Sequence, residues 1–137
     1  MQNPQLYEFL FQAGAPMCSG PAEVIFQEGE TAQGAYVLQS GRAELSFVTE
    51  RRPLMWSHTA GPGAIGLAPA MVGSTHLFTA VTVEETTMSF IPRDELRDLV
   101  YACPLVGLDI VHALSAEAEA MQERRSLLLQ KRNSPTR

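Results

Sequence analysis

The stretch that decides the fold runs from Ile25 to Leu45 and reads IFQEGETAQGAYVLQSGRAEL. Gly29 ends its first apolar run, and the pair Ser40-Gly41 marks a tight turn before its last run. In that last run Ala43 and Leu45 alternate with polar residues, and a period of two is typical of a half-buried strand. The stretch therefore predicts short consecutive strands joined by tight turns.

The same alternation of short apolar runs and turns continues toward the C-terminus. In one run Leu54, Trp56 and His58 are spaced two apart, which predicts that they share one face of a strand. Two more β-rich runs, FTAVTV and TTMSFI, are separated by Glu84-Glu85. Many short strands with regular glycine and proline turns indicate a β-barrel or sandwich.

Helices are predicted at both ends of this β-rich region. Pro4 and Gly14 suit the first turn and the exit of a short N-terminal helix, and Pro92, followed by acidic residues, suits the start of another. A further helix could run from Pro104 to about Lys131. We therefore divide the chain into an N-terminal helix and lead-in (1–20), a β-roll (21–103), a long helix (104–132) and a tail (133–137).

The bulk composition excludes several classes of protein. The 137 residues fit one domain, and since 45% of them are hydrophobic and 18% charged, a packed core is expected. The net charge of −5 argues against a nucleic-acid-binding surface over the whole chain. No apolar stretch approaches the roughly 20 residues that a membrane span needs, and the N-terminus lacks a signal-peptide pattern. Cys18 and Cys103 predict two reduced, buried thiols in a cytoplasmic protein.

Two stretches together resemble the sensor domain of the CRP/FNR regulators and of other cyclic-nucleotide-binding domains. They are the opening stretch, Ile25 to Leu45, and the stretch from Gly61 to Val100. The resemblance implies a mainly β fold with flanking helices, namely a double-stranded β-helix (a jelly-roll-like β-roll) followed by a long C-terminal helix. It also places the family's phosphate-binding cassette at the segment that begins with Gly66.

The cassette departs from the family's pattern at its two charged positions. Leu67 stands where the family carries a Glu, and Phe78 stands where it carries an Arg. Because a buried phosphate needs a positive partner and several hydrogen-bond donors, we expect a drier, apolar pocket that does not hold a cyclic nucleotide in the usual way. His76 is the nearest substitute cation in the sequence, although a plain loop histidine is the simpler interpretation.

The remaining residues of the candidate pocket follow from the same resemblance. The glycine that opens the cassette matches, as do the threonine and alanine after the Arg position, so the backbone frame and one hydroxyl group are kept. The resemblance also brings one residue of the long helix near a bound base. The candidate pocket is Gly66, Leu67, Ala68, Phe78, Thr79, Ala80 and Met121.

The long helix carries apolar residues at alternating three- and four-residue steps. Such a seam is typical of a dimeric coiled coil, and its first half also fits packing against the β-roll. We expect a homodimer, because the second half lies too far out for a domain this small to cover. The seam residues are Val111, Leu114, Ala118, Met121 and Leu128.

Sequence motifs for catalysis or metal binding are missing. His58, His76 and His112 are widely spaced and form no metal-ligand pattern, and there is no nucleophile elbow, P-loop or paired-carboxylate motif. We therefore expect no enzyme, no metal site and no cofactor. A haem role, known among relatives of this family, stays open for the three histidines.

Three functions compete at this point. The leading hypothesis is a non-catalytic, homodimeric sensor or regulatory module whose pocket is empty or takes an atypical small-molecule effector. The second is a pure interaction or scaffold protein with a filled pocket. The third is a cyclic-nucleotide receptor that uses Thr79 and backbone N–H groups. Because the residues after the long helix leave no room for a helix-turn-helix domain, we expect no DNA binding by this chain.

Overall fold

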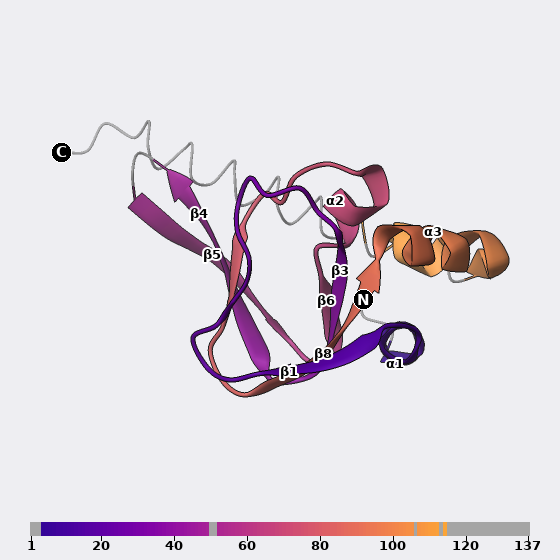
Figure 1. Ribbon diagram of the computed structural model, residues 1–137, viewed down its shortest axis with the longest axis horizontal. Helices are drawn as coiled ribbons and strands as arrows, with labels where there is room; N and C mark the ends of the chain where they lie inside the picture. The colour runs from indigo at the N-terminus through magenta and orange to yellow at the C-terminus, as the bar shows by residue number, and fades with distance from the viewer. Residues whose placement is uncertain (1–3, 50–51, 106, 113, 115–137) are drawn as a thin grey trace.

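The computed structural model describes residues 4–49, 52–105, 107–112 and 114. Within them the chain forms two four-stranded antiparallel sheets and flanking helices (Figure 1). The strands are β1 (Ala15–Ser19), β2 (Val24–Phe26), β3 (Gly34–Ser40), β4 (Arg42–Thr49), β5 (Arg52–Ala60), β6 (Gly63–Ile65), β7 (Thr79–Thr82) and β8 (Thr86–Pro92). The helices are α1 (Pro4–Ala13), α2 (Leu67–Val72) and α3 (Arg93–Ala102).

Along the chain, the strands pass back and forth between the two sheets. One sheet has the order β1-β8-β3-β6, and the other has the order β2-β7-β4-β5. Consecutive strands therefore often lie in different sheets, as they do in a jelly-roll-like β-roll. The predicted mainly β fold with flanking helices is confirmed, whereas most of the predicted long C-terminal helix lies outside the described residues.

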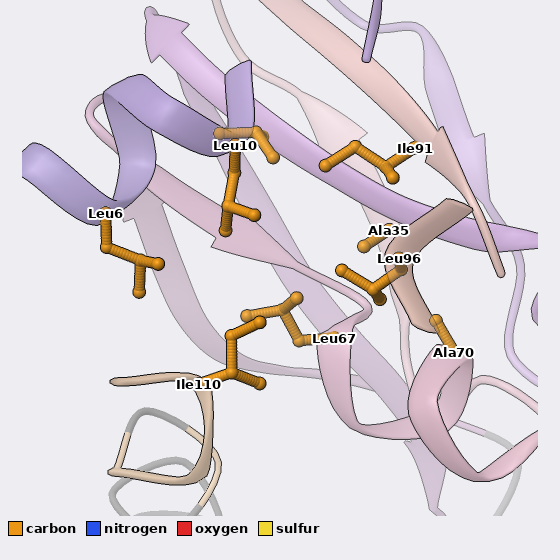
Figure 2. Packing of buried hydrophobic residues seen from close by; sticks show 9 residues of the cluster. Leu6, Leu10, Ala35, Leu67, Ala70, Ile91, Leu96 and Ile110 are labelled. Carbon is orange, nitrogen blue, oxygen red and sulfur yellow. The ribbon is translucent and has the colours of Figure 1, made fainter. Parts of the chain in front are cut away.

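Both faces of the sheet β1-β8-β3-β6 are covered, and each face has its own apolar cluster. Figure 1 shows α1 and α3 beside this sheet, on the side away from β4 and β5. We call the cluster between the helices and the sheet the helix-side core: Leu6, Leu10, Ala35, Val37, Leu67, Ala70, Ile91, Leu96 and Ile110 (Figure 2). We call the cluster between the two sheets the roll interior: Phe26, Leu38, Ala43, Leu45, Ile65, Ala80 and Met88.

The helices form as the sequence predicts and bury one face each. Leu6 and Leu10 are four residues apart on α1, which places both side chains on the face that packs on the sheet. In α3, acidic residues occupy the first turn, where they suit the helix dipole, and Leu96 is buried. Among the described residues no helix is both long enough and apolar enough to cross a membrane.

Strand β5 corrects one expectation from the sequence. Leu45 pairs with Ser57 and Ser46 pairs with Met55, so one extra residue, Trp56, is inserted in β5 at this point. Because a bulge of one residue reverses the alternation of faces, positions 54 and 58 lie on opposite faces of the sheet. The prediction that Leu54, Trp56 and His58 share one face is therefore wrong.

The cysteines correct a second expectation. Both are free, but Cys18 is exposed and Cys103 is half-buried. Cys18 lies on β1, which is an edge strand of its sheet and most of whose side chains face solvent. The predicted burial of the two thiols is therefore wrong, because Cys18 lies on an exposed edge strand and Cys103 lies just after the end of α3.

Candidate functional site

The cassette begins with a backbone turn that suits glycine. Gly66, between β6 and α2, has φ 78° and ψ 13°, in the left-handed region that other residues rarely adopt. A Cβ atom at this position would also lie 3.2 Å from Cε1 of His76. The short helix α2 follows, and Gly73 ends it by donating its N–H to the carbonyl oxygen of Pro69 at 2.8 Å. The cassette therefore opens with a left-handed glycine followed by a short helix.

The two positions that carry charge in the family point into different clusters. Leu67 is buried in the helix-side core, near Ile110 (Figure 2). Phe78 is half-buried and packs against the roll interior. The expectation that Leu67 and Phe78 line one apolar pocket is therefore not met. The reason is local: Leu67 lies on the face of α2 that is turned toward the other helices.

The hydroxyl group expected to read a phosphate already has a partner within the chain. Thr79, on β7, accepts a hydrogen bond at its Oγ1 from the backbone N–H of Glu28 at 3.0 Å. The carboxylate of Glu28 in turn accepts a hydrogen bond from the N–H of Val48 at 3.0 Å. Thr79 therefore ties β7 to the turn after β2. Ala80 is buried in the roll interior, and Ala68 is half-buried.

His76 is a titratable side chain enclosed near this interior. It is 4% exposed. Its ring stacks on Phe26 with a centroid distance of 3.7 Å and an interplanar angle of 9°. Its Nδ1 atom is buried and has no hydrogen-bond partner. Burial lowers the pKa of His76, against a smaller upward effect from the carboxylate of Glu30. His76 is therefore neutral at pH 7 and does not serve as the substitute cation that its position suggested.

A row of aromatic rings continues from His76 across the interior. Phe26 lies 5.9 Å from Tyr36, and Tyr36 lies 5.0 Å from Phe90, measured between ring centroids. Burial raises the pKa of the Tyr36 hydroxyl, and the negative charge of Glu30 raises it further. Sequence reasoning missed this row because its rings come from three separate strands and a loop. The only local signal was the aromatic content of the strands.

None of the cationic side chains that the structure describes points into the roll interior. Arg42 and Arg97 are exposed. Arg93, the third described cation, donates from Nε to the carbonyl oxygen of Ala70 at 3.0 Å, so it binds the end of α2. The carboxylate of Glu30 instead lies near enough to His76 to act on its pKa. The local balance of charge thus disfavours an anion.

The predicted dimer seam is described only at its beginning. Val111 is exposed, and Leu114 packs partly against the helix-side core. Ala118, Met121 and Leu128 lie outside the described residues. The role of Met121 as a pocket or seam residue therefore stays a prediction.

The other two histidines lie apart from the cassette. His58, on β5, is an exposed residue whose Nε2 lies 3.6 Å from a carboxylate oxygen of Glu44. His112 is exposed. In the described part of the chain no three residues of the types His, Cys, Asp and Glu come together to hold a metal ion.

Two antiparallel sheets packed against each other, with a left-handed glycine and a short helix after β6, define a β-roll. The family model of the cyclic nucleotide-binding domain matches residues 20–102, more than half of the chain. The chain therefore belongs to the cyclic nucleotide-binding domain family. A search among curated protein sequences gives no match.

Solved structures of this fold agree with that assignment. The catabolite activator protein of Thermus thermophilus is 18% identical over 92% of this chain and 60% of its own, with a TM-score of 0.79. A transcriptional regulator of Thermotoga maritima is 15% identical over 88% of this chain and 95% of its own, with a TM-score of 0.75. A putative cAMP-binding regulatory protein of Silicibacter pomeroyi is 19% identical over 95% and 57%, with a TM-score of 0.65. This chain thus spans about 60% of the Thermus protein.

Proposed function

We propose that this chain is a non-catalytic sensor or regulatory module whose roll interior does not hold a cyclic nucleotide by the usual charged pair. The observation that carries the proposal is Phe78, an apolar ring packed against the roll interior at the position of the family's Arg. The regulators among the solved structures of the same fold support a regulatory role. The net charge of −5 supports a role without direct DNA contact by this chain.

The surroundings of Phe78 support the same conclusion. A phosphate in this place would find the hydroxyl of Thr79 already bonded to the backbone of Glu28. Replacement of the Arg by Phe78 removes one charge-assisted hydrogen bond, worth about 1.5–3 kcal/mol net. This loss amounts to about one to two decades of affinity.

Calorimetry with cAMP and with cGMP tests the proposal directly. We expect no saturation up to about 1 mM nucleotide, which corresponds to about −4 kcal/mol. Dissociation constants in the micromolar range or below would overturn it. In that case Thr79→Val decides whether the receptor reads phosphate through its hydroxyl group, as the alternative receptor hypothesis requires.

A gain-of-function variant makes the same test sharper. Phe78→Arg returns the missing cation, and one charge-assisted hydrogen bond of about 1.5–3 kcal/mol is expected to strengthen cAMP binding about 10- to 150-fold. Phe78→Leu is the matched control, because it opens similar space without adding charge. Equal affinity in the two variants would mean that position 78 does not face the nucleotide.

We further propose that the module is a homodimer joined through its C-terminal helix. Just before and at the start of the seam, the structure describes three exposed apolar side chains spaced three residues apart: Leu105, Leu108 and Val111. A second copy of the chain is the occupant that we infer, because the seam continues beyond them in the sequence. Light scattering of Val111→Asp should give a monomer. Val24→Asp is the control at equal exposure, since both valines are 54% exposed, and should leave a dimer.

One observation favours a second function, a pure interaction or scaffold protein with a filled interior. The stack of His76 on Phe26 buries both rings, and Tyr36 and Phe78 pack against the same cluster. Native mass spectrometry of the purified protein separates the two functions. A specific co-purified small molecule would support the sensor, and a ligand-free mass in every preparation, together with no binding of small molecules, would support the scaffold.

A further inference from the structure

A short backbone clasp joins the turn after β2 to the segment after α2. It consists of residues 29–32 and 74–76, which run antiparallel and are bridged at Thr31 and Thr75. Its hydrogen bonds are donated by Gly29 to the carbonyl oxygen of His76 (2.9 Å), by His76 to Glu30 (2.9 Å) and by Ala32 to Ser74 (3.0 Å). Two of the three bonds therefore use the backbone of His76.

The side chain of His76 is enclosed beneath this clasp. Phe26 covers one face of its ring at 3.7 Å, and Gly66 approaches its Cε1 edge so closely that a Cβ atom would lie 3.2 Å away. Its Nδ1 atom is buried without a hydrogen-bond partner. An imidazole packed in this way suits the neutral form, because a buried cation without a paired carboxylate is strongly disfavoured.

The charged groups around the His76 ring do not offset the cost of burying a protonated imidazole. On the turn after β2, Glu30 accepts a hydrogen bond at its Oε1 from the backbone of Gln27 at 2.9 Å, and Glu28 accepts one from the backbone of Val48. On β3, the Tyr36 hydroxyl is uncharged, because its pKa is raised. Neither α2 nor β7 carries a titratable side chain, and β2 carries none within its three residues. Arg93 lies beside Gly73, just before residues 74–76, and adds a positive charge there.

We propose that this clasp is an acid-sensitive latch, closed while His76 is neutral and opened when His76 takes up a proton. Opening releases residues 74–76 from the turn after β2 and exposes the ring of Phe26, which belongs to the roll interior. The latch thus controls access to the interior from one end. It does not depend on which ligand, if any, the interior binds.

The direction of the pH effect follows from linkage. Burial holds the pKa of His76 in the closed latch below its ordinary value of 6.5. Above pH 6.5 both the closed and the open forms are neutral at this residue, and pH has no effect through it. As the pH falls below 6.5 the open form binds the proton first. Opening then becomes more favourable by at most about tenfold per pH unit, until the pH reaches the pKa of the closed form.

Amide hydrogen exchange read by NMR tests the latch at its own hydrogen bonds. Protection factors of the Gly29, Ala32 and His76 amides are compared at about pH 7.5 and about pH 5.5, each corrected for intrinsic exchange. We expect them to fall by up to about tenfold at the lower pH in the unaltered chain. His76→Phe keeps a stacking ring but cannot titrate, so its three amides should keep their protection. His58→Phe changes an exposed histidine and should behave like the unaltered chain.

Two results would overturn the latch. One is equal protection at the two pH values in the unaltered chain, and the other is the same acid loss in His76→Phe. If His76→Phe does not fold, the Cε1 proton of His76 is titrated in the unaltered chain instead. A pKa at or above 6.5 there would also overturn the proposal.

Discussion

The helix-side core and the roll interior share two strands but differ in chemistry. Along β3, Ala35 and Val37 face the helices, whereas Tyr36 and Leu38 face the other sheet. The helix-side core is wholly aliphatic among its buried residues and is sealed by side chains from α1, α2 and α3. The roll interior is bordered by half-buried aromatic rings and by the unpartnered imidazole of His76.

The two regions therefore differ in aromatic content, with the aromatic rings gathered at the roll interior. A cluster of fully buried aliphatic side chains maximises the apolar area removed from water. Each side of the sheet also encloses one polar atom without a hydrogen-bond partner: Ser89 Oγ, beside Ile91 and Gly14, and Nδ1 of His76, whose ring stacks on Phe26. The cassette connects the two regions, because Leu67 packs into one and Phe78 against the other.

Replacing Leu67 and Phe78 separately by Glu should give the largest difference between the two regions. Leu67→Glu places a carboxylate in the helix-side core without a partner and should lower the free energy of unfolding by about 3–5 kcal/mol. Phe78→Glu should lower it by less than half as much, because the side chain at position 78 is only half-buried. Urea denaturation measures both. Equal losses in the free energy of unfolding would show that positions 67 and 78 are equally shielded from water.

The next effect concerns the packing of the helix-side core. Leu10 is fully buried, so Leu10→Ala should lower the free energy of unfolding by about 2–5 kcal/mol through lost apolar contacts and the cavity left behind. Phe9, its neighbour on α1, is 40% exposed. Phe9→Ala is therefore the control and should cost less than about 1 kcal/mol in the same urea titration. A larger loss at Phe9 would place the buried face of α1 elsewhere.

A smaller effect is expected at the turn that opens the cassette. Gly66→Ala forces a Cβ atom into the left-handed region and toward His76, which should cost about 1–2 kcal/mol. Gly20→Ala is the control, because Gly20 has no positive φ and the nearest atom to its added Cβ is a carboxylate oxygen of Glu23 at 3.6 Å. Thermal unfolding followed by circular dichroism compares the two. Similar melting temperatures would mean that the turn relaxes without strain.

The smallest expected effect is a gain in stability. His76→Phe keeps the ring on Phe26 and removes the unsatisfied Nδ1 atom, so the free energy of unfolding at about pH 7.5 should rise by about 1 kcal/mol. The gain should be larger at about pH 5.5, since only the unaltered chain loses stability as the pH falls below 6.5. Urea denaturation at both pH values measures it. A loss of stability at pH 7.5 would show that the imidazole has a partner that Phe cannot replace.

Much of the fold was predictable, because it depends on patterns within short segments. The run RAELSFVT forms β4 from Arg42 to Thr49, and the helix expected after Pro92 is α3. The bulge at Trp56 was not predictable, because nothing in the alternation of β5 marks an inserted residue. The edge strand β1 was missed for a related reason, since four of its five side chains are exposed and carry no burial pattern.

The candidate site was predictable only in part. The sequence placed the glycine turn at Gly66 and the aromatic residue at Phe78, and both lie in the cassette. It did not place Leu67 in the helix-side core. It also did not bring His76 onto Phe26, because the two residues come from segments far apart in the chain.

The sequence by itself determined most of the strands and turns and the absence of an Arg at position 78, because each depends on the identity and spacing of neighbouring residues. Only the tertiary structure decided which cluster receives each cassette residue and how His76 is enclosed. The physical reason is that burial, stacking and the pKa of a side chain depend on every segment packed around it. Local periodicity carries no information about those segments.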